Sequence, residues 1–334
     1  MSDTMLETEI TFTMTTQIQN EGSELESSMP PPTAIWQTNT EWIKKSELLD
    51  YVCSWDEIQK FQSNLAELSL IFKDCRDMVH FKEFFLMRTV ILIWRGNKLE
   101  TGRICGTQDN ILAALKLLQE NGAVDETELV CRKTWDAEGK EPEGWQFMGE
   151  QAARGYFLLQ MSANRGERLT VEFIKRVHGI LMSGGMTYCG QFRTDAAYAD
   201  DYVFAPHIDI EKRMHSMVAS FEERVVSVEK SYAVRVAVQL MLDFVTIRPF
   251  SNGNGRMCRL LFSYALQRMG FPFPVMLDSG RSKSYKHYIT ALKQAQTRCK
   301  LGPLLQLAAV SINATLTNYA TYSQTSEFQF LLNK

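Results

Sequence analysis

The sequence lacks the features that would send a protein to the cell exterior, into a membrane or onto a nucleic acid. Its first twenty residues, MSDTMLETEITFTMTTQIQN, are acidic and polar and contain no apolar core of a secretory signal. The longest apolar stretch, 84–94, is interrupted by Arg88 and is too short to span a bilayer. The net charge of −3 offers no basic excess for nucleic acid or anionic lipid. We therefore expect a cytoplasmic or nuclear protein with no nucleic-acid or membrane partner.

Paired cysteines are also missing. The seven cysteines form an odd number and contain no Cys-x-x-Cys pair. Neither a disulfide framework nor a zinc site is indicated, and a reduced compartment fits best. No internal repeat is visible either.

What the sequence does have is the composition of a globular protein. Its 334 residues are 45% apolar and 22% charged, which is enough for a sizeable core in two domains or in one domain with extensions. Residues 1–40 are rich in Ser, Thr, Glu and Gln and carry three consecutive prolines, so we expect a disordered or loosely attached arm.

Apolar periodicity predicts a mostly α-helical fold. Helical spacing is found at 56–73, 79–95, 107–121, 147–163, 170–182, 209–228, 231–247 and 255–269, with two or three more helices expected in 280–320. Thr170 or its neighbour is a suitable cap for the helix that follows. Residues 186–208 have aromatics but no helical period, which predicts one short hairpin. We expect a helical region at 41–145 that ends in a loop at 131–146, a second domain at 146–320, and a tail at 321–334.

One segment, 246–261 (TIRPFSNGNGRMCRLL), has the character of an anion cradle. Gly253 and Gly255 allow positive φ and a close approach of a ligand to the backbone. The N–H groups of such a turn and of the helix that follows attract anions. Arg256 and Arg259 lie three apart on that helix and can both donate to phosphate oxygens, which favours a di- or triphosphate. A capped turn between two core helices, with both arginines in surface ion pairs, is the plainer alternative.

The residues at 248–259, RPFSNGNGRMCR, resemble the signature of Fic-domain (Fido) proteins, His-Pro-Phe-x-Asp/Glu-Gly-Asn-Gly-Arg-x-x-Arg. Upstream, 177–181 (VHGIL) is similar to the family's helix before the flap. The stretch 190–194 (GQFRT) is similar to the Gly-x-Tyr/Phe-Arg sequence with which the flap begins. The resemblance covers about 150–310 and implies a Fic-type helical bundle with a small β-hairpin flap.

The resemblance also implies an activity and a ligand. Most Fic proteins transfer AMP from ATP to a hydroxyl of a target protein, and some transfer other phosphate-bearing groups. By position, Gly253, Asn254 and Gly255 would wrap the α- and β-phosphates, and Arg256 and Arg259 would hold the distal phosphates. Residues 190–206 would form the flap that holds a target or regulatory protein segment as an added strand.

The sequence departs from the signature at two functional positions. Arg248 stands where the family has the histidine that accepts the target's proton, and a guanidinium has no acceptor. Asn252 stands where the family has a carboxylate for Mg²⁺, so magnesium affinity should be weak. Arg248 could instead add a third cation to the cradle, or pair with Asp243 or with the flap.

Two functions follow as hypotheses. The first is a Fic-fold, ATP-binding pseudoenzyme or strongly impaired protein adenylyltransferase that acts as a binding or regulatory module. The second is an active transferase of AMP, or of another phosphate-bearing group, by a variant mechanism. An empty helical scaffold is a third possibility. The sequence leaves the target and the oligomeric state open.

Residues 96–101, GNKLET, are similar in their centre to the family's inhibitory Ser/Thr-x-x-x-Glu-Gly/Asn motif, which implies a pair between Glu100 and Arg259. An exposed glutamate at a helix end is the alternative. Among the histidines, His178 lies on an apolar helix face and is expected to be a packed core residue. His207 falls at the end of the flap, and His80, His215 and His287 show no ligand spacing with one another.

Overall fold

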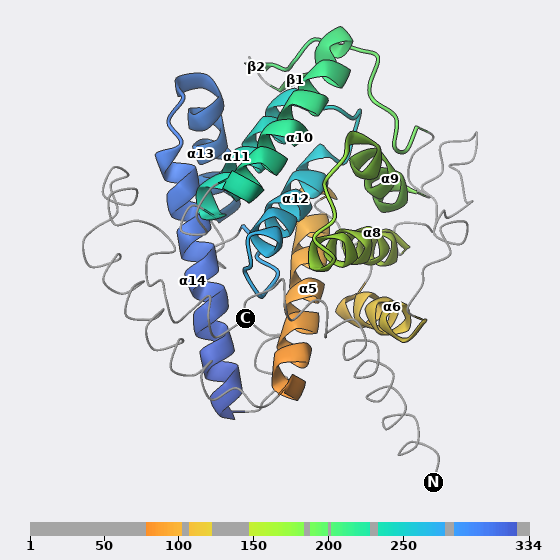
Figure 1. The fold of residues 1–334 in the computed structure, drawn as a ribbon, viewed down its shortest axis with the longest axis vertical. Coiled ribbons are helices and arrows are strands. Elements are labelled where there is room, and N and C mark those ends of the chain that lie inside the picture. The colour runs from red at the N-terminus through yellow and green to blue at the C-terminus, as the bar shows by residue number, and fades with distance from the viewer. Residues whose placement is uncertain are drawn as a thin grey trace.

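The computed structural model describes residues 78–101, 107–121, 147–183, 188–199, 202–227, 233–277 and 284–325. These residues form a mostly helical fold, as predicted (Figure 1). The helices are α5 (Met78–Thr101), α6 (Gln108–Asn121), α8 (Phe147–Asn164), α9 (Val171–Met182), α10 (Ile210–Ser227), α11 (Ala233–Ile247), α12 (Asn254–Arg268), α13 (Ser284–Arg298) and α14 (Gly302–Thr325).

The predicted helices in this part of the chain are confirmed, and most end close to the predicted residue. The first described one, α5, continues past the predicted end at 95 to Thr101. The last, α14, reaches Thr325, so the predicted tail at 321 begins inside a helix. The predicted arm at 1–40, the helix at 56–73 and the loop at 131–146 lie outside the described residues.

Helix α12 lies at the centre of the bundle, packed against α11, α8 and α5 (Figure 1). Nearly its whole length is buried, including every residue from Arg256 to Leu266. A helix that is covered on all sides belongs to a core. The N-terminal turn of α12 carries the predicted cradle, so this site is built on the most enclosed element of the fold.

The predicted hairpin is small. Strands β1 (Tyr198–Ala199) and β2 (Tyr202–Val203) pair antiparallel, with Tyr198 opposite Val203. The hairpin lies between α9 and α10 in the sequence, and a 3₁₀ turn at His207–Asp209 leads into α10. Within the described ranges, no helix is both long and apolar enough to cross a membrane.

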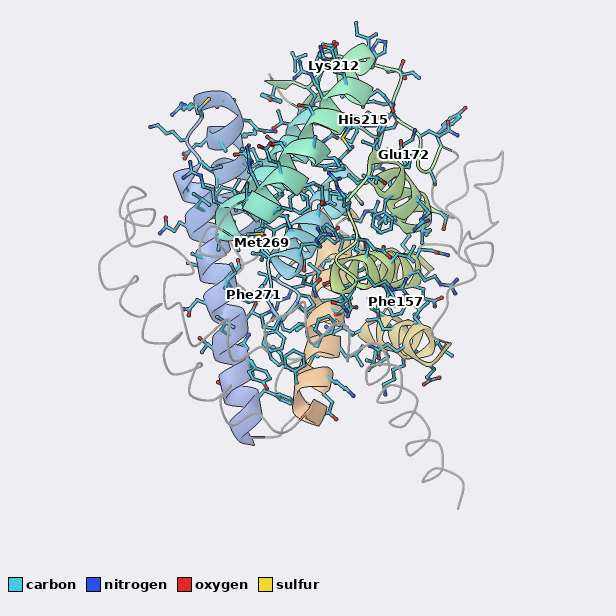
Figure 2. The ribbon with its side chains drawn as sticks, in the orientation of Figure 1. Phe157, Glu172, Lys212, His215, Met269 and Phe271 are labelled. Carbon is cyan, nitrogen blue, oxygen red and sulfur yellow. The ribbon has the colours of Figure 1, made fainter. Side chains whose placement is uncertain are left out.

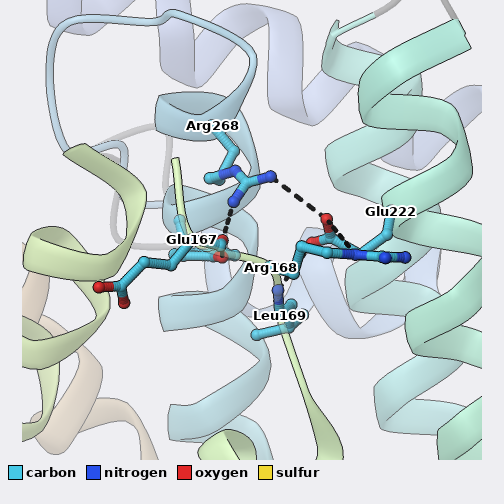
Figure 3. A network of polar contacts seen from close by, with 6 residues as sticks. Glu167, Arg168, Leu169, Glu222 and Arg268 are labelled. Carbon is cyan, nitrogen blue, oxygen red and sulfur yellow. Dashed lines mark hydrogen bonds and ion pairs between the residues drawn. The ribbon is translucent and has the colours of Figure 1, made fainter. Parts of the chain in front are cut away.

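The connection into α9 is fixed by a cap and by a buried carboxylate. The Thr170 hydroxyl accepts from the Phe173 N–H at 3.0 Å, which confirms the predicted cap. One residue earlier, the Leu169 N–H donates to Glu222 of α10 at 2.8 Å. Arg268 of α12 donates to the other Glu222 oxygen at 3.3 Å and to the Glu167 carbonyl (Figure 3). This network joins the start of α9 to α10 and to the C-terminal end of α12.

Candidate functional site

The turn into α12 requires glycine at position 253 for two separate reasons. Gly253 has φ 75° and ψ 0°, a left-handed conformation that disfavours other residues. A Cβ added there would lie 2.6 Å from Met182 Sδ and 3.1 Å from His178 Nε2. The backbone at Gly253 is therefore pressed against α9, and the following N–H groups form the open first turn of α12.

The side chain of Asn254 closes the loop on itself. Its Oδ1 accepts from the Phe250 N–H at 3.0 Å and its Nδ2 donates to the Phe250 carbonyl at 2.6 Å. Asn254 is buried, so its amide shapes the loop. The backbone N–H groups of Asn254 and Gly255 have no acceptor inside the helix, because the first turn has no preceding carbonyls. Such a helix start is a ready site for phosphate.

Arg256 and Arg259 are enclosed rather than spread over the surface. They are 4% and 2% exposed, so the alternative of surface ion pairs does not hold. The Arg259 Nη2 donates to the Gly96 carbonyl of α5 at 2.9 Å. The end of α5 thus borders the cradle at the arginine that the resemblance assigns to the distal phosphates. The side chain of Glu100 is outside the described part of the chain, so a Glu100–Arg259 pair stays a prediction.

Asn252 is poorly suited to hold a magnesium ion. It is exposed, and its Oδ1 accepts from the N–H of Gly253 at 2.7 Å. Its backbone carbonyl is paired with His178. Because Mg²⁺ prefers carboxylates and phosphate oxygens, one neutral, occupied oxygen does not fit this role.

Arg248 is held by the flap. Its guanidinium carbon lies 4.8 Å from the centre of the Phe204 ring, within cation–π range. Its backbone is left-handed, with φ 49°, at the point where α11 ends. Asp243, the acidic neighbour weighed from the sequence, accepts instead from Gln239 at 2.7 Å. Of the pairings considered for Arg248, the structure shows the one with the flap.

A buried arginine clamps the flap onto the loop between α11 and α12. Arg193 is 6% exposed, and its Nε donates to the Arg248 carbonyl at 2.7 Å. Its Nη atoms donate to the carbonyls of Asp195 and Ala205 in the flap and of Ile247 at the end of α11. Burial, then the charge of Arg248, lower the pKa of Arg193. Four hydrogen bonds to backbone carbonyls make this side chain a structural bracket.

His178 forms a second bridge between the same two segments. Its Nδ1 accepts from the Gly190 N–H at 3.0 Å, and its Nε2 lies 3.0 Å from the Asn252 carbonyl. The ring stacks on Phe250, with centroids 3.6 Å apart. Burial lowers the pKa of His178 to about 4, opposed by the Asn252 bond and aided by the charge of Arg256. His178 is buried, as expected, but it also joins the flap to the cradle.

Comparison with known proteins agrees with this geometry. The model of the Fic/DOC family matches residues 168–266. A Fido domain-containing protein of Dictyostelium discoideum is 32% identical over 146 residues, which are 43% of this chain and 94% of the relative. The chain belongs to the Fic/Fido family.

Longer Fic relatives are also similar. A protein adenylyltransferase Fic of Nematostella vectensis is 26% identical over 158 residues. These residues make up 46% of this chain and 35% of the relative. This Fic chain therefore spans between about a quarter and about a third of the length of the adenylyltransferases that it matches. Among solved structures, a Fic domain containing signaling protein from Bacteroides thetaiotaomicron has a TM-score of 0.58 at 19% identity, covering 78% of this chain and 98% of its own. Fic-1 from C. elegans has a TM-score of 0.51 at 16% identity, covering 93% and 87%. These two structures share the Fic fold.

One polar cluster of this Fic chain was not found from the sequence. The ligand atoms of Glu172, Glu211 and His215 lie within 4.8 Å of one another, and all three residues are exposed. Figure 2 shows Glu172 on α9 and His215 on α10. His215 and Glu211 form an i,i+4 pair at 3.4 Å. The third member could not be predicted from residue spacing, because Glu172 comes from another helix.

Proposed function

We propose that this Fic chain binds ATP, or a related nucleoside di- or triphosphate, at the start of α12. We further propose that it transfers AMP poorly or not at all and acts as a binding or regulatory module. The observation that carries the proposal is the placement of Arg248. A cation without a proton acceptor stands at the family's base position, and it lies against the flap.

The cradle itself supports nucleotide binding. The left-handed Gly253 opens the first turn of α12, and the loop before it is fixed by the paired amide of Asn254. The enclosed guanidinium groups of Arg256 and Arg259 add positive charge on the same helix. Guanidinium groups bind phosphate oxygens in pairs and gain strength from burial.

Impaired transfer follows from the two substituted positions. A positioned base contributes roughly 10²–10⁴ in rate, and the guanidinium of Arg248 cannot accept the proton of a target hydroxyl. Asn252 has a neutral amide in place of the carboxylate that would hold magnesium against the phosphates, and its Oδ1 also accepts from the Gly253 N–H. The protein adenylyltransferases among the relatives are the reason to test AMP transfer rather than another reaction.

The flap is the part that we propose to present to a protein partner. Tyr198 and Val203 are each more than half exposed and lie opposite one another on the hairpin. A short strand with free edges can accept an extended segment as a further strand. We expect nucleotide binding and partner binding to be the retained functions, in the cytoplasm or nucleus and without a nucleic-acid or membrane partner.

Calorimetric titration with ATP tests binding first. Transfer is then tested with α-labelled ATP in a cell lysate, using wild type beside Arg248→His/Asn252→Asp, each with and without Glu100→Gly. We expect ATP binding by wild type and labelling only by the restored variants.

Two results would overturn parts of the proposal. If the folded protein does not bind ATP, the start of α12 is not a nucleotide-binding site. Labelling by wild type at the rate of the restored variants would reject impairment and point to an active transferase with another base. Arg248→Gln is the matched control, since it removes the same charge as Arg248→His and supplies no titratable base.

A further inference from the structure

His178 connects two segments that the chain itself keeps apart. Gly190, where the flap begins, lies twelve residues away, and Asn252, at the cradle, lies 74 residues away. A backbone N–H has only a proton to donate, so Nδ1 must be the acceptor and unprotonated. The proton of the neutral ring is then on Nε2, which donates to the Asn252 carbonyl. Both ring nitrogens are used, and the tautomer is set by the two backbones.

Close packing on both sides makes this bridge stiff. Gly190 has φ 75°, and a Cβ there would lie 2.7 Å from the Lys175 carbonyl. Gly253 lies against the Nε2 side of the ring, and Phe250 covers one face of the ring, nearly parallel to it. A shift of the backbone at Gly190 should therefore reach the cradle loop through the ring, because the space for a Cβ at Gly190 is taken by the Lys175 carbonyl and the space for one at Gly253 borders the ring.

We infer that His178 is a positioning residue that couples the flap to the nucleotide cradle through its neutral, Nε2-protonated ring. Occupation of the cradle would then order the flap, and a partner on the flap would change nucleotide affinity to the same extent. The inference deepens the proposed nucleotide binding and rests on it only for the second measurement below.

The charges around the ring favour this neutral form. From α12, the guanidinium of Arg256 disfavours a second proton. The cradle loop contributes the Asn252 carbonyl, which acts in the opposite direction. On the flap side, Gly190 presents an N–H and its neighbour Cys189 a half-buried thiol. From α8, Gly155 lies against the Val177 carbonyl of α9 and carries no charge.

Two conservative variants separate the two bonds. His178→Asn places a carbonyl oxygen near the position of Nδ1, so it can keep the bond from Gly190 and loses the one to Asn252. His178→Gln reaches the position of Nε2, so it can keep the Asn252 bond and loses the acceptor for Gly190. His287→Asn on α13 is the matched control, because His287 is exposed.

The first measurement is amide hydrogen exchange in the full chain without nucleotide. Loss of one buried hydrogen bond should speed exchange at Gly190 about tenfold in His178→Gln. In His178→Asn the change should stay within about threefold, and the control should match wild type. Equal acceleration in both variants, or none in His178→Gln, would overturn the inference. The ¹⁵N signals of the wild-type ring provide a check without any variant: a proton on Nδ1 would also overturn it.

The second measurement repeats the exchange with ATP. In wild type we expect slower exchange in the cradle and also at Gly190. In both His178 variants we expect slower exchange in the cradle alone. Protection of Gly190 in the variants would reject the coupling. If ATP protects nothing in wild type, the proposed nucleotide binding fails, and the first measurement still decides whether His178 holds the flap.

Discussion

The guanidinium of Arg248 lies over the ring of Phe204, 4.8 Å from its centre. This contact joins the first position of the Fic signature to the flap, and Arg193 joins the same two segments through backbone carbonyls. The position at which the family has its histidine is thus occupied here by a side chain that contacts the flap.

Phe204→Leu should loosen the flap while keeping an apolar side chain there. The lost contact is worth about 1 kcal/mol, so exchange of the Phe204 amide, which donates to the Ala197 carbonyl, should rise about fivefold. Val203→Ala is the control, because that side chain is exposed. If both variants exchange alike, the ring does not hold the flap through Arg248.

Arg259→Ala should weaken ATP binding more than Arg248→Ala. Arg259 is buried on α12 within the cradle, whereas Arg248 stacks on the flap. Charged hydrogen bonds contribute about 1.5–3 kcal/mol each, so we expect a loss of about 10–100-fold for Arg259→Ala and less than about fivefold for Arg248→Ala. Calorimetric titration measures both, and thermal unfolding checks that each variant is folded. Equal or reversed losses would reject the phosphate assignment.

The helices and the signature could be predicted from sequence because their causes are local. The period of apolar residues marks α8 to α12, and Thr170 caps α9 through its own neighbour three residues on. The positive φ at Gly253 could also be predicted, because glycine is favoured at such positions in turns. These features depend on residues that are adjacent in the chain.

The bonds that position the site could not be predicted in the same way. Arg193 lies 55 residues from Arg248, and His178 lies 74 residues from Asn252. Nothing in the spacing of these residues shows that their partners are backbone carbonyls, because any residue type supplies a carbonyl. The signature marked the segments that meet, and only the fold shows which side chains bind them together.

ATP affinity should depend little on magnesium in wild type. The Oδ1 of Asn252 is neutral and already accepts from Gly253, so addition of Mg²⁺ should change affinity by less than about threefold. In Asn252→Asp, addition of Mg²⁺ should raise ATP affinity about tenfold. Ser251→Asp is the control, because it adds the same charge at an exposed neighbouring position. A strong magnesium effect in wild type would show that another group holds the ion.

Stability should rise with pH through the range in which His178 differs between the folded and unfolded chain. Its pKa falls from 6.5 to about 4 on folding, chiefly through burial. Between these values the unfolded chain binds more protons, so stability is full above about pH 6.5 and is lost as the pH falls toward 4. This pKa shift of His178 contributes about 3 kcal/mol to the free energy of unfolding above that range.

Urea unfolding at about pH 4.5 and at about pH 7 measures this dependence. His178→Asn should show a smaller loss on acidification than wild type, by roughly 2 kcal/mol, while His287→Asn should match wild type. Since carboxylates also titrate in this range, the difference between the two proteins is the informative quantity. If wild type and His178→Asn lose the same free energy of unfolding on acidification, burial does not keep the His178 ring neutral.

Gly253→Ala should be far more damaging than Gly166→Ala, although both glycines have similar φ values of 75° and 65°. A Cβ at Gly166 meets nothing within 4 Å, whereas one at Gly253 would lie 2.6 Å from Met182 Sδ. The left-handed backbone alone costs about 1–2 kcal/mol in each case. The crowding at Gly253 should add about 1–3 kcal/mol and should also lower ATP affinity by at least about tenfold, because the first turn of α12 must shift. Thermal unfolding and calorimetric titration of both variants test this. Equal losses of stability would show that Met182 gives way, and that the close approach between α9 and α12 is not what holds the cradle in place.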